Sequence, residues 1–248
     1  MRRTGGWVVA VIFLVFGMVA IPADPPRKRE RPVYEAKANH DPDGIGKFYM
    51  GREIAMVMGY GAAGWLERPE RVKEEEPTKL VEALAVKPGM VVADVGAGSG
   101  YHDFLLSPLV GEKGKVIASD IQPEMLDLIR QKAKRLKVTN IETVKGTDDD
   151  PKLPVSGVDL IILVDVYHEF AKPFEMTEKM VDALKPGGRL VFVEFKLEDE
   201  KVPIKLVHKM SERQVIKEME PFPELEHTKT VNTLAWQHVI IFTKKGVK

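Results

Sequence analysis

The strongest constraint on the fold is an apolar run that ends in three closely spaced glycines. Residues 91–95 have the pattern of a buried strand, and Gly96, Gly98 and Gly100 follow at once, before a helical pattern begins at Tyr101. Glycine is required where the backbone takes positive φ or approaches a ligand closely. A strand, a glycine turn and a helix in this order are typical of an open α/β sheet with its ligand at the carboxyl ends of the strands. The segment therefore predicts both the class of sheet and the place of its ligand site.

The spacing of the glycines separates two kinds of ligand. A dinucleotide site has the pattern G-x-G-x-x-G, but Tyr101 occupies the position of its last glycine. The spacing here is the tighter G-x-G-x-G, and Asp94 stands two residues before the first glycine. The sequence also lacks an evident Tyr and Lys pair for hydride transfer. Both observations disfavour a nicotinamide-dependent oxidoreductase, which is kept as an alternative to the interpretation below.

Short β-branched runs alternate with amphipathic stretches after residue 90. The expected strands are 90–95, 115–119, 140–144, 158–164 and 189–195, and the expected helices include 124–136 and 173–184. This alternation implies right-handed crossovers and a parallel sheet with helices on both faces. After a last helix near 211–219, two strands at 224–231 and 234–243 are joined by so short a turn that they must be antiparallel. The sequence predicts an α/β fold, mostly parallel, with a C-terminal antiparallel hairpin.

Together these patterns resemble the class I S-adenosylmethionine-dependent methyltransferases, over roughly residues 81–243. The glycine turn resembles motif I of that family. The resemblance implies a Rossmann-like sheet, S-adenosyl-L-methionine as the cofactor, and methyl transfer to an unidentified acceptor, which we expect to be a small molecule. A second alternative is a non-catalytic protein that binds S-adenosylmethionine, because a fold alone does not establish an activity.

The resemblance also assigns cofactor contacts. At the glycine turn, Asp94 is expected to contact the cationic amino end of the ligand, directly or through water. Asp120, after the second strand, is expected to accept hydrogen bonds from the ribose hydroxyls, and Ile121 to pack against the adenine. Asp148 is expected at the adenine amino group, although the family often places this acid where Thr147 stands. The alternative for Asp148 is a solvated acidic turn.

The segment that follows the fourth strand, at the family's motif IV position, supplies the candidate catalytic residues. Asp165 is assigned to the cofactor site. His168 is expected to orient or deprotonate the acceptor, because imidazole titrates near neutrality, and Glu169 is a second candidate. Alternatively, His168 only closes the pocket or caps the following helix. His208 is a candidate for the lining of the acceptor pocket.

Residues 46–80 are expected to form a helical lid over the cofactor, with helices at 52–58 and 62–71. Tyr49 and Arg52 are then candidates to reach the methionine carboxylate or the acceptor, Tyr49 as a catalytic and Arg52 as a substrate-binding residue. Alternatively, Tyr49 packs and Arg52 pairs with an acid in residues 74–76. With residues 165–170, this stretch most resembles predicted bacterial methyltransferases that carry signal sequences. The remaining divisions are a linker at 24–45 and a methyltransferase domain at 81–248.

Composition removes several other functions. Lys plus Arg and Asp plus Glu are 37 each, so no net charge favours a nucleic acid as partner. The chain has no cysteine, which excludes disulfides and thiolate metal sites. None of its histidines shows H-x-x-x-H or H-E-x-x-H spacing, so no metal site is predicted. The oligomeric state is left open.

The first residues form a targeting segment. Arg2 and Arg3 precede an uncharged apolar run at 7–21, and Ala23 offers a cleavage point. Fifteen helical residues reach about 22 Å, short of the roughly 30 Å hydrocarbon core, which favours a cleaved signal peptide. The basic residues of 27–31 favour instead a membrane anchor with the domain inside. Both alternatives predict a cell-envelope location, with membrane contact through residues 7–21, whereas a buried N-terminal helix would not.

Overall fold

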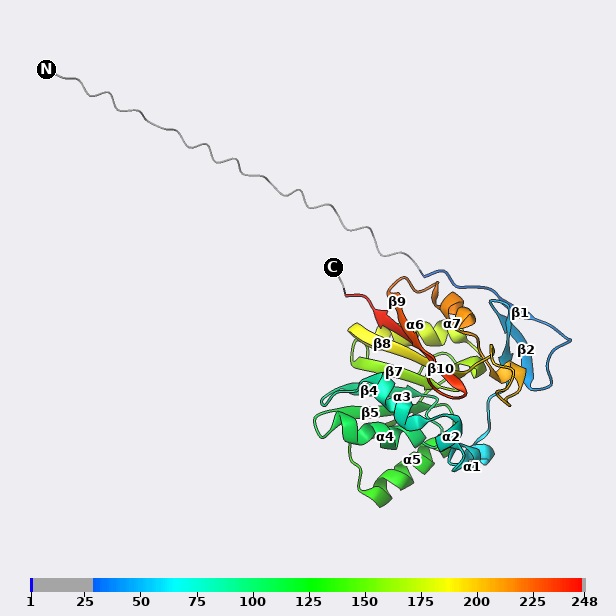
Figure 1. Cartoon of the computed structure of the whole chain (residues 1–248), viewed down its shortest axis with the longest axis horizontal. Helices are drawn as coiled ribbons and strands as arrows, with labels where there is room; N and C mark the ends of the chain where they lie inside the picture. The colour runs from blue at the N-terminus through cyan, green and yellow to red at the C-terminus, as the bar shows by residue number, and fades with distance from the viewer. Residues whose placement is uncertain (2–28, 247–248) are drawn as a thin grey trace.

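The computed structural model describes Met1 and residues 29–246. Its main sheet has seven strands in the order β6-β5-β4-β7-β8-β10-β9 (Figure 1). The strands are β4 Val91–Val95, β5 Lys115–Asp120, β6 Ile141–Lys145, β7 Val158–Val164, β8 Leu184–Phe195, β9 Leu225–Val231 and β10 Gln237–Lys244. The first five in chain order are parallel, and β10 runs antiparallel to both β8 and β9. The predicted fold, a mostly parallel sheet with a C-terminal antiparallel hairpin, is confirmed.

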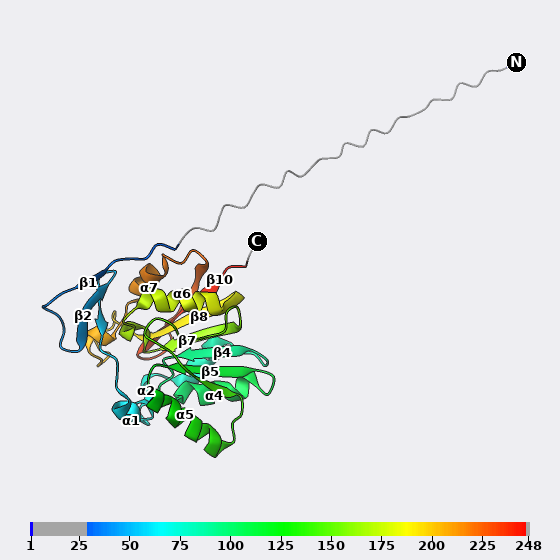
Figure 2. The same cartoon turned by 180° about the vertical axis from the view of Figure 1, so that it is seen from behind.

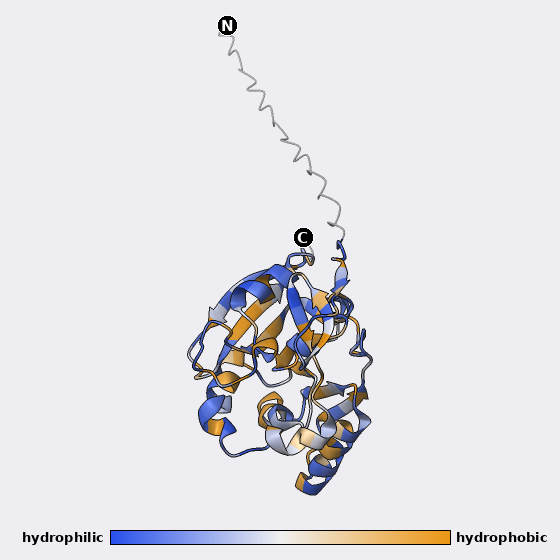
Figure 3. Ribbon diagram, turned by 90° about the vertical axis from the view of Figure 1, so that its right-hand side faces the viewer, coloured by the Kyte–Doolittle hydropathy of each residue, from blue (hydrophilic) through white to orange (hydrophobic). Residues whose placement is uncertain are grey.

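Helices cover both faces of this sheet because its strands are apolar on both sides. Leu160 and Ile162 of β7 face the helices α3 Pro77–Leu84 and α4 Tyr101–Val110, and α5 Pro123–Leu136 lies on the same side. Ile161 and Leu163 face α6 Pro173–Ala183 and α7 Glu212–Met219 on the other side. Figure 3 shows the apolar residues gathered on the strands between these layers. All four β7 side chains are fully buried, as expected for a parallel sheet with two covered faces.

A small antiparallel sheet precedes the main domain and corrects the predictions for residues 24–58. Its strands are β1 Tyr34–Ala36, β2 Gly44–Tyr49 and β3 Arg52–Ala55, in that order, and it lies beside α7 (Figures 1 and 2). Part of the predicted linker is therefore a strand, and the helix predicted at 52–58 is wrong. Met50 and Gly51 both have positive φ, which suits the tight turn of a two-residue hairpin. Burial of the strand residues in the core then stabilises the hairpin over a local helix.

The chain between this small sheet and the main domain forms only short helices. They are η1 Tyr60–Ala62, α1 Ala63–Leu66 and α2 Arg71–Glu74. The helix predicted at 62–71 is divided at Pro69, because proline cannot donate the backbone hydrogen bond that would continue it. Two other 3-10 turns, η2 Tyr167–Glu169 and η3 Leu206–His208, carry residues of the site described below.

The predicted targeting segment at 7–21 lies outside the described residues. Among the helices that are described, none is both long and apolar enough to cross a bilayer. The described part starts at Arg29, whose guanidinium pairs with Asp182 on α6 at 2.8 Å and with Glu224 at 2.9 Å. The chain is thus attached to the main domain before β1 begins.

Candidate active site

A cavity of about 510 Å³ opens at the carboxyl ends of the parallel strands. Residues that follow five adjacent strands contribute to its wall: Gly96 after β4, Asp120 at the end of β5, Gly146 after β6, Asp165 after β7, and Phe195 at the end of β8. Its volume lies within the range of about 300–1,000 Å³ that is usual for small-molecule sites. The site therefore lies at the edge of the sheet that the glycine turn predicted.

The glycine turn lines this cavity and has no room for side chains. Gly96 has φ +78°, and a Cβ there would lie 2.3 Å from Cγ2 of Val166. Gly98 has φ +55°, and a Cβ there would lie 2.7 Å from Cδ1 of Leu66. Gly100 caps the N-terminus of α4 and is not part of the cavity lining. Two of the three predicted glycines thus form the wall, and the third starts the helix behind it.

Asp120 and Ile121 line the cavity at the end of β5. The carboxylate of Asp120 accepts hydrogen bonds from the backbone N–H of Gly98, at 2.9 Å, and of Gln122, at 2.8 Å. Burial raises the pKa of Asp120, and these backbone donors oppose the rise. Each oxygen keeps a further lone pair for a ligand hydroxyl. The side chain of Ile121 is 41% exposed, so an apolar surface is available beside the carboxylate.

The acidic turn after β6 contributes two residues to the cavity wall. Asp148 and Thr147 both line the cavity. Asp148 is exposed, and one of its oxygens lies 3.0 Å from Nζ of Lys172. An ion pair with an exposed lysine contributes little, so it leaves the carboxylate available to a ligand.

Asp94 lies behind the glycine turn, and the predicted direct contact with the ligand is corrected. It is 2% exposed and is not part of the cavity lining. Because side chains alternate along a strand, Asp94 points toward α4, where the fully buried Asp103 lies, while its neighbour Val95 lines the cavity. Burial raises the pKa of Asp94 to about 7, opposed by Arg71, and burial, followed by Asp94, raises the pKa of Asp103 well above its ordinary value. Burial therefore favours the protonated form of these two carboxyl groups beneath the turn.

Asp165 presents an unpaired carboxylate oxygen in the cavity wall. Its Oδ2 accepts a hydrogen bond from Nε2 of Gln237 at 2.6 Å, and its buried Oδ1 has no partner among the described residues. Burial, followed by the nearby Glu75 and Glu194, raises its pKa well above the ordinary value. Its φ of +50° costs about 1–3 kcal/mol, a strain that is common at functional sites. Asp165 can therefore receive a cationic group of a ligand.

Arg71 is a cavity residue that the sequence did not predict. It is 4% exposed, forms an ion pair with Glu75, and donates a hydrogen bond to the carbonyl of Leu66 at 2.8 Å. Its guanidinium carbon lies 4.5 Å from the ring centroid of Tyr101. A planar, buried guanidinium in the wall suits a ligand carboxylate. An arginine for that purpose was expected, but at position 52.

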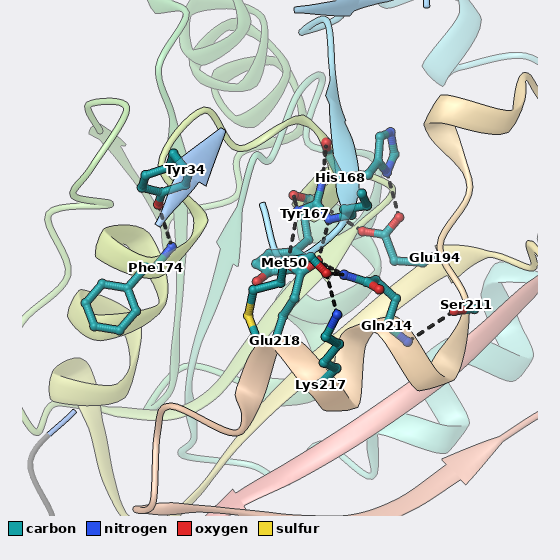
Figure 4. Close-up of polar contacts among 11 residues, drawn as sticks. Tyr34, Met50, Tyr167, His168, Phe174, Glu194, Ser211, Gln214, Lys217 and Glu218 are labelled. Carbon is teal, nitrogen blue, oxygen red and sulfur yellow. Dashed lines mark hydrogen bonds and ion pairs between the residues drawn. The ribbon is translucent and has the colours of Figure 1, made fainter. Parts of the chain in front are cut away.

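Arg52 instead joins the small sheet to α7. It donates to Glu218 at 2.6 and 3.1 Å and to the backbone carbonyl of His168 at 3.0 Å. Figure 4 shows Glu218 and Gln214 of α7 directed at the turn that contains Met50. Arg52 is not part of the cavity lining, so its predicted substrate contact is corrected. The alternative prediction, an ion pair between Arg52 and an acid in residues 74–76, is wrong as well, because its partner is Glu218.

Tyr49 is also a packing residue. It is fully buried, is not part of the cavity lining, and its ring centroid lies 5.2 Å from that of Tyr34. Burial raises the pKa of its hydroxyl well above the ordinary value, which makes it a poor proton donor or acceptor at neutral pH. The predicted catalytic role of Tyr49 is corrected to the structural alternative.

His168 is oriented by a buried carboxylate. Its Nδ1 lies 2.6 Å from Oε2 of Glu194 on β8, which is fully buried and also accepts from the backbone N–H of Tyr167 (Figure 4). Burial lowers the pKa of His168, but Glu194 and then Glu169 oppose it, and the net shift is upward. The carboxylate fixes the proton on Nδ1. The other ring nitrogen, Nε2, makes the contacts described next.

Three candidate residues, two of them adjacent in sequence and the third about 40 positions later, meet in the cavity wall. Nδ1 of His208 lies 3.2 Å from Nε2 of His168. Oε1 of Glu169 lies 4.0 Å from the His168 nitrogen and 3.9 Å from the His208 nitrogen. Burial raises the pKa of Glu169 to about 7, and burial, followed by His168, lowers that of His208 to about 4. We call His168, Glu169 and His208 the His–Glu–His cluster. Beside it, Phe170, Phe195 and Ile204 supply an apolar wall.

Comparisons with known proteins find methyltransferases among the proteins similar to this chain. A crystal structure of a SAM dependent methyltransferase from Aquifex aeolicus has a TM-score of 0.71 and 28% identity, and the match covers 76% of this chain and all of that one. The Protein-L-isoaspartate O-methyltransferase of Pyrococcus horikoshii is 33% identical over 45% of this chain, and the Ubiquinone/menaquinone biosynthesis C-methyltransferase UbiE of Salmonella arizonae is 32% identical over 46%. The chain spans about half the length of these two curated relatives, 47% and 46% respectively.

The family match covers most of the main domain and decides between the alternatives. Residues 86–244 match the family model described as a methyltransferase domain. This span contains every strand of the main sheet and the glycines that line the cavity, Gly96, Gly98 and Gly146. A nicotinamide-dependent oxidoreductase is thereby excluded. The chain belongs to the methyltransferase domain family, as a class I methyltransferase that uses S-adenosyl-L-methionine.

Proposed function

We propose that this enzyme methylates an oxygen or nitrogen atom that carries a dissociable proton on a small, partly apolar molecule. The observation that carries the proposal is the pairing of Glu194 with His168 at 2.6 Å in a cavity that the glycine turn also lines. A buried carboxylate that orients a histidine toward a cavity is an arrangement for accepting a proton from a bound acceptor. The relatives named above act on different acceptor atoms by name, so the choice rests on the site itself.

The cavity residues fit S-adenosyl-L-methionine. A side chain at Gly96 or Gly98 would fill the wall, so the turn leaves the backbone open to a ligand. Asp120 and Ile121 would hold the ribose and adenine, Asp165 the cationic amino group, and Arg71 the carboxylate. When bound, the cofactor supplies a methyl group on a positively charged sulfur, which is already electrophilic. The protein's own task is then alignment and exclusion of water.

The acceptor end of the cavity follows from the order of the strands. Asp120 ends β5, whereas His168 follows β7 and Phe195 ends β8, on the other side of β4. An acceptor would place its apolar part against Phe195 and Ile204, and its nucleophilic atom at the His–Glu–His cluster. Loss of the acceptor's proton to this cluster would leave a lone pair to attack the methyl group.

Calorimetry and a product screen test this function. The full chain should bind S-adenosylmethionine and its demethylated product with micromolar affinity. Incubation with panels of small phenols, alcohols, amines and thiols should give a mass increase of one methyl group with a proton-bearing oxygen or nitrogen acceptor. His168→Ala should abolish turnover and leave cofactor affinity nearly unchanged, while His227→Ala, on exposed β9, should behave as wild type. Methylation only of thiols or carbon, or equal loss of cofactor affinity in His168→Ala, would contradict the proposal.

We also propose that the enzyme works at the cell envelope, like the bacterial methyltransferases with signal sequences that it resembles. The support is the sequence of residues 2–23, with two arginines, an apolar run and small residues after it. Equal numbers of acidic and basic residues support a small-molecule acceptor over a nucleic acid.

A further inference from the structure

The His–Glu–His cluster holds more ligand atoms than a proton acceptor needs. The nitrogens of His168 and His208 and an oxygen of Glu169 lie within 4.8 Å of one another, in the wall of the cavity. The two histidines are 40 positions apart and come together because η2 and η3 meet at the same sheet edge. This juxtaposition could not be found from the spacing of histidines along the sequence.

The distances suit coordination of one ion. A zinc ion lies about 2.0–2.1 Å from each imidazole nitrogen, so two nitrogens in a tetrahedral site are roughly 3.3 Å apart. Nε2 of His168 and Nδ1 of His208 are 3.2 Å apart. Oε1 of Glu169, at 4.0 and 3.9 Å from these nitrogens, would need to approach by roughly half an ångström. This side chain is 11% exposed, and the same oxygen accepts a hydrogen bond from the backbone N–H of Met58 at 3.2 Å, which would have to lengthen or pass to Oε2 in that shift.

A partner outside the cluster supports the same interpretation. Histidines that bind metals usually donate their other ring N–H to a carboxylate, which fixes the ring and makes it a better ligand. Glu194 holds Nδ1 of His168 in this way, with both side chains buried. Glu194 is itself held by the backbone N–H of Tyr167 at 3.0 Å. The backbone N–H of Tyr167 thus holds Glu194, Glu194 holds Nδ1 of His168, and His168 lines the cavity.

We propose that His168, Glu169 and His208 bind a divalent transition-metal ion of the zinc type, with a coordination position open to the cavity. Two imidazoles and one carboxylate are the ligand set of several catalytic zinc sites, whereas Mg²⁺ and Ca²⁺ prefer oxygen ligands. The ion would bind the acceptor's nucleophilic atom and ease the loss of its proton. Binding of the ion stands on the cluster alone, while this use of it rests on the proposed function.

Without a metal, the same contact has a simple explanation. Nδ1–H of His208 would donate a hydrogen bond to Nε2 of His168, and the two histidines would form a proton relay from Glu194. The two arrangements differ in what His208 contributes. If His208 is a metal ligand, its removal lowers the affinity for zinc. If His208 is only a member of the relay, its removal leaves that affinity unchanged.

Direct binding measurements distinguish them. The full chain, freed of any affinity tag and dialysed against a chelator, is titrated with Zn²⁺ and with Mg²⁺ by calorimetry, and with Co²⁺ by visible absorption. We expect one Zn²⁺ per chain, no comparable binding of Mg²⁺, and a cobalt spectrum of low coordination number. His208→Ala should weaken zinc binding by more than the roughly 10–100-fold that loss of an outer partner costs. Glu194→Gln, as that outer partner, should weaken it within this range.

Two further variants guard against misfolding. Glu169→Gln keeps the shape of the side chain and should also weaken zinc binding, with the unfolding temperature within a few degrees of wild type. His227→Ala, on the exposed surface of β9, should bind zinc as wild type does. Zinc that binds wild type no more tightly than His208→Ala, or Mg²⁺ that binds equally well, would overturn the metal site. If the metal-free chain still binds the cofactor and transfers methyl groups, the proposed function stands without the metal site. If one Zn²⁺ per chain binds tightly but no acceptor is methylated, the metal site stands and the proposed function is contradicted.

Discussion

Arg52 of β3 and Glu218 of α7 form a two-pronged ion pair, at 2.6 and 3.1 Å, in which the carboxylate is fully buried. Removing one partner of such a pair leaves an uncompensated buried charge and typically costs 3–5 kcal/mol. Arg52→Ala should therefore lower the free energy of unfolding by about 3–5 kcal/mol in urea titrations. Its affinity for S-adenosylmethionine, measured where the protein is folded, should not change. Arg213→Ala, exposed on the same helix, should cost less than about 0.5 kcal/mol.

Asp120 is expected to hold the ribose. Asp120→Ala should weaken binding of S-adenosylmethionine by about 1–3 kcal/mol, the usual size for lost charge-assisted hydrogen bonds. Asp127→Ala is a matched control, because Asp127 is exposed on α5 and, within the described part of the chain, pairs with Arg130 alone. Calorimetry that finds the same affinity in both variants would remove Asp120 from the cofactor site.

Arg71 is expected to hold the methionine carboxylate. Wild type should bind S-adenosylmethionine more tightly than its decarboxylated analogue, by about 1.5–3 kcal/mol. Arg71→Met should bind the two ligands with similar affinity, and Arg71→Lys should restore part of the difference. If Arg71→Met still prefers the intact cofactor by the wild-type factor, another group binds the carboxylate.

The raised pKa values of Asp94 and Asp103 predict how stability depends on pH. Burial raises both pKa values above the ordinary 3.8, that of Asp94 to about 7. The folded state therefore binds more protons than the unfolded state, and this contribution to stability is lost as the pH rises from about 4 through 7. Asp103→Asn cannot ionise at this position. Between pH 5 and pH 8 its unfolding free energy should fall by less than that of wild type, by on the order of 1 kcal/mol or more, in guanidinium titrations. An unchanged pH dependence would mean that the pair is not protonated.

The N-terminal segment is tested by fractionation with mass spectrometry of the protein expressed in a bacterium. A new N-terminus at Asp24 in a soluble extracytoplasmic fraction would identify a cleaved signal peptide. An intact N-terminus in the membrane fraction would identify an anchor. Intact protein recovered wholly from the soluble cytosol would contradict the envelope proposal.

Local patterns predicted the main sheet because its central strands are apolar on both faces and are bounded by turns. The glycine turn was predictable for the same reason, since the requirement for glycine at Gly96 and Gly98 is local. The small sheet was not, because Met50 and Gly51 lack the Asn-Gly or Asp-Gly signature of a hairpin, and the burial that stabilises it comes from the distant core.

The residues of the candidate site also differ in whether local sequence or tertiary structure determines their place. Asp120, Asp165 and His168 follow strands directly, so their place at the sheet edge could be read from the strand pattern. Arg52 pairs with Glu218, whereas Arg71 lines the cavity. Both contacts depend on tertiary structure, so the sequence did not indicate which arginine would reach a ligand carboxylate. The contact between His168 and His208 likewise arises from tertiary structure alone.

Gln122 lies next to Asp120 and also holds the segment that covers the cavity. Its Nε2 donates to the carbonyl of Met58 at 3.0 Å, and its Oε1 accepts from the backbone N–H of Tyr60 at 2.8 Å. Val57, Met58, Trp65 and Leu66 of this segment line the cavity, although η1 and α1 bury no residue. A ligand that meets Asp120 therefore acts on the same short stretch of β5 and α5 that keeps the cover closed. Any effect that the cofactor has through this segment on the affinity for the acceptor must be matched by an equal effect of the acceptor on the affinity for the cofactor.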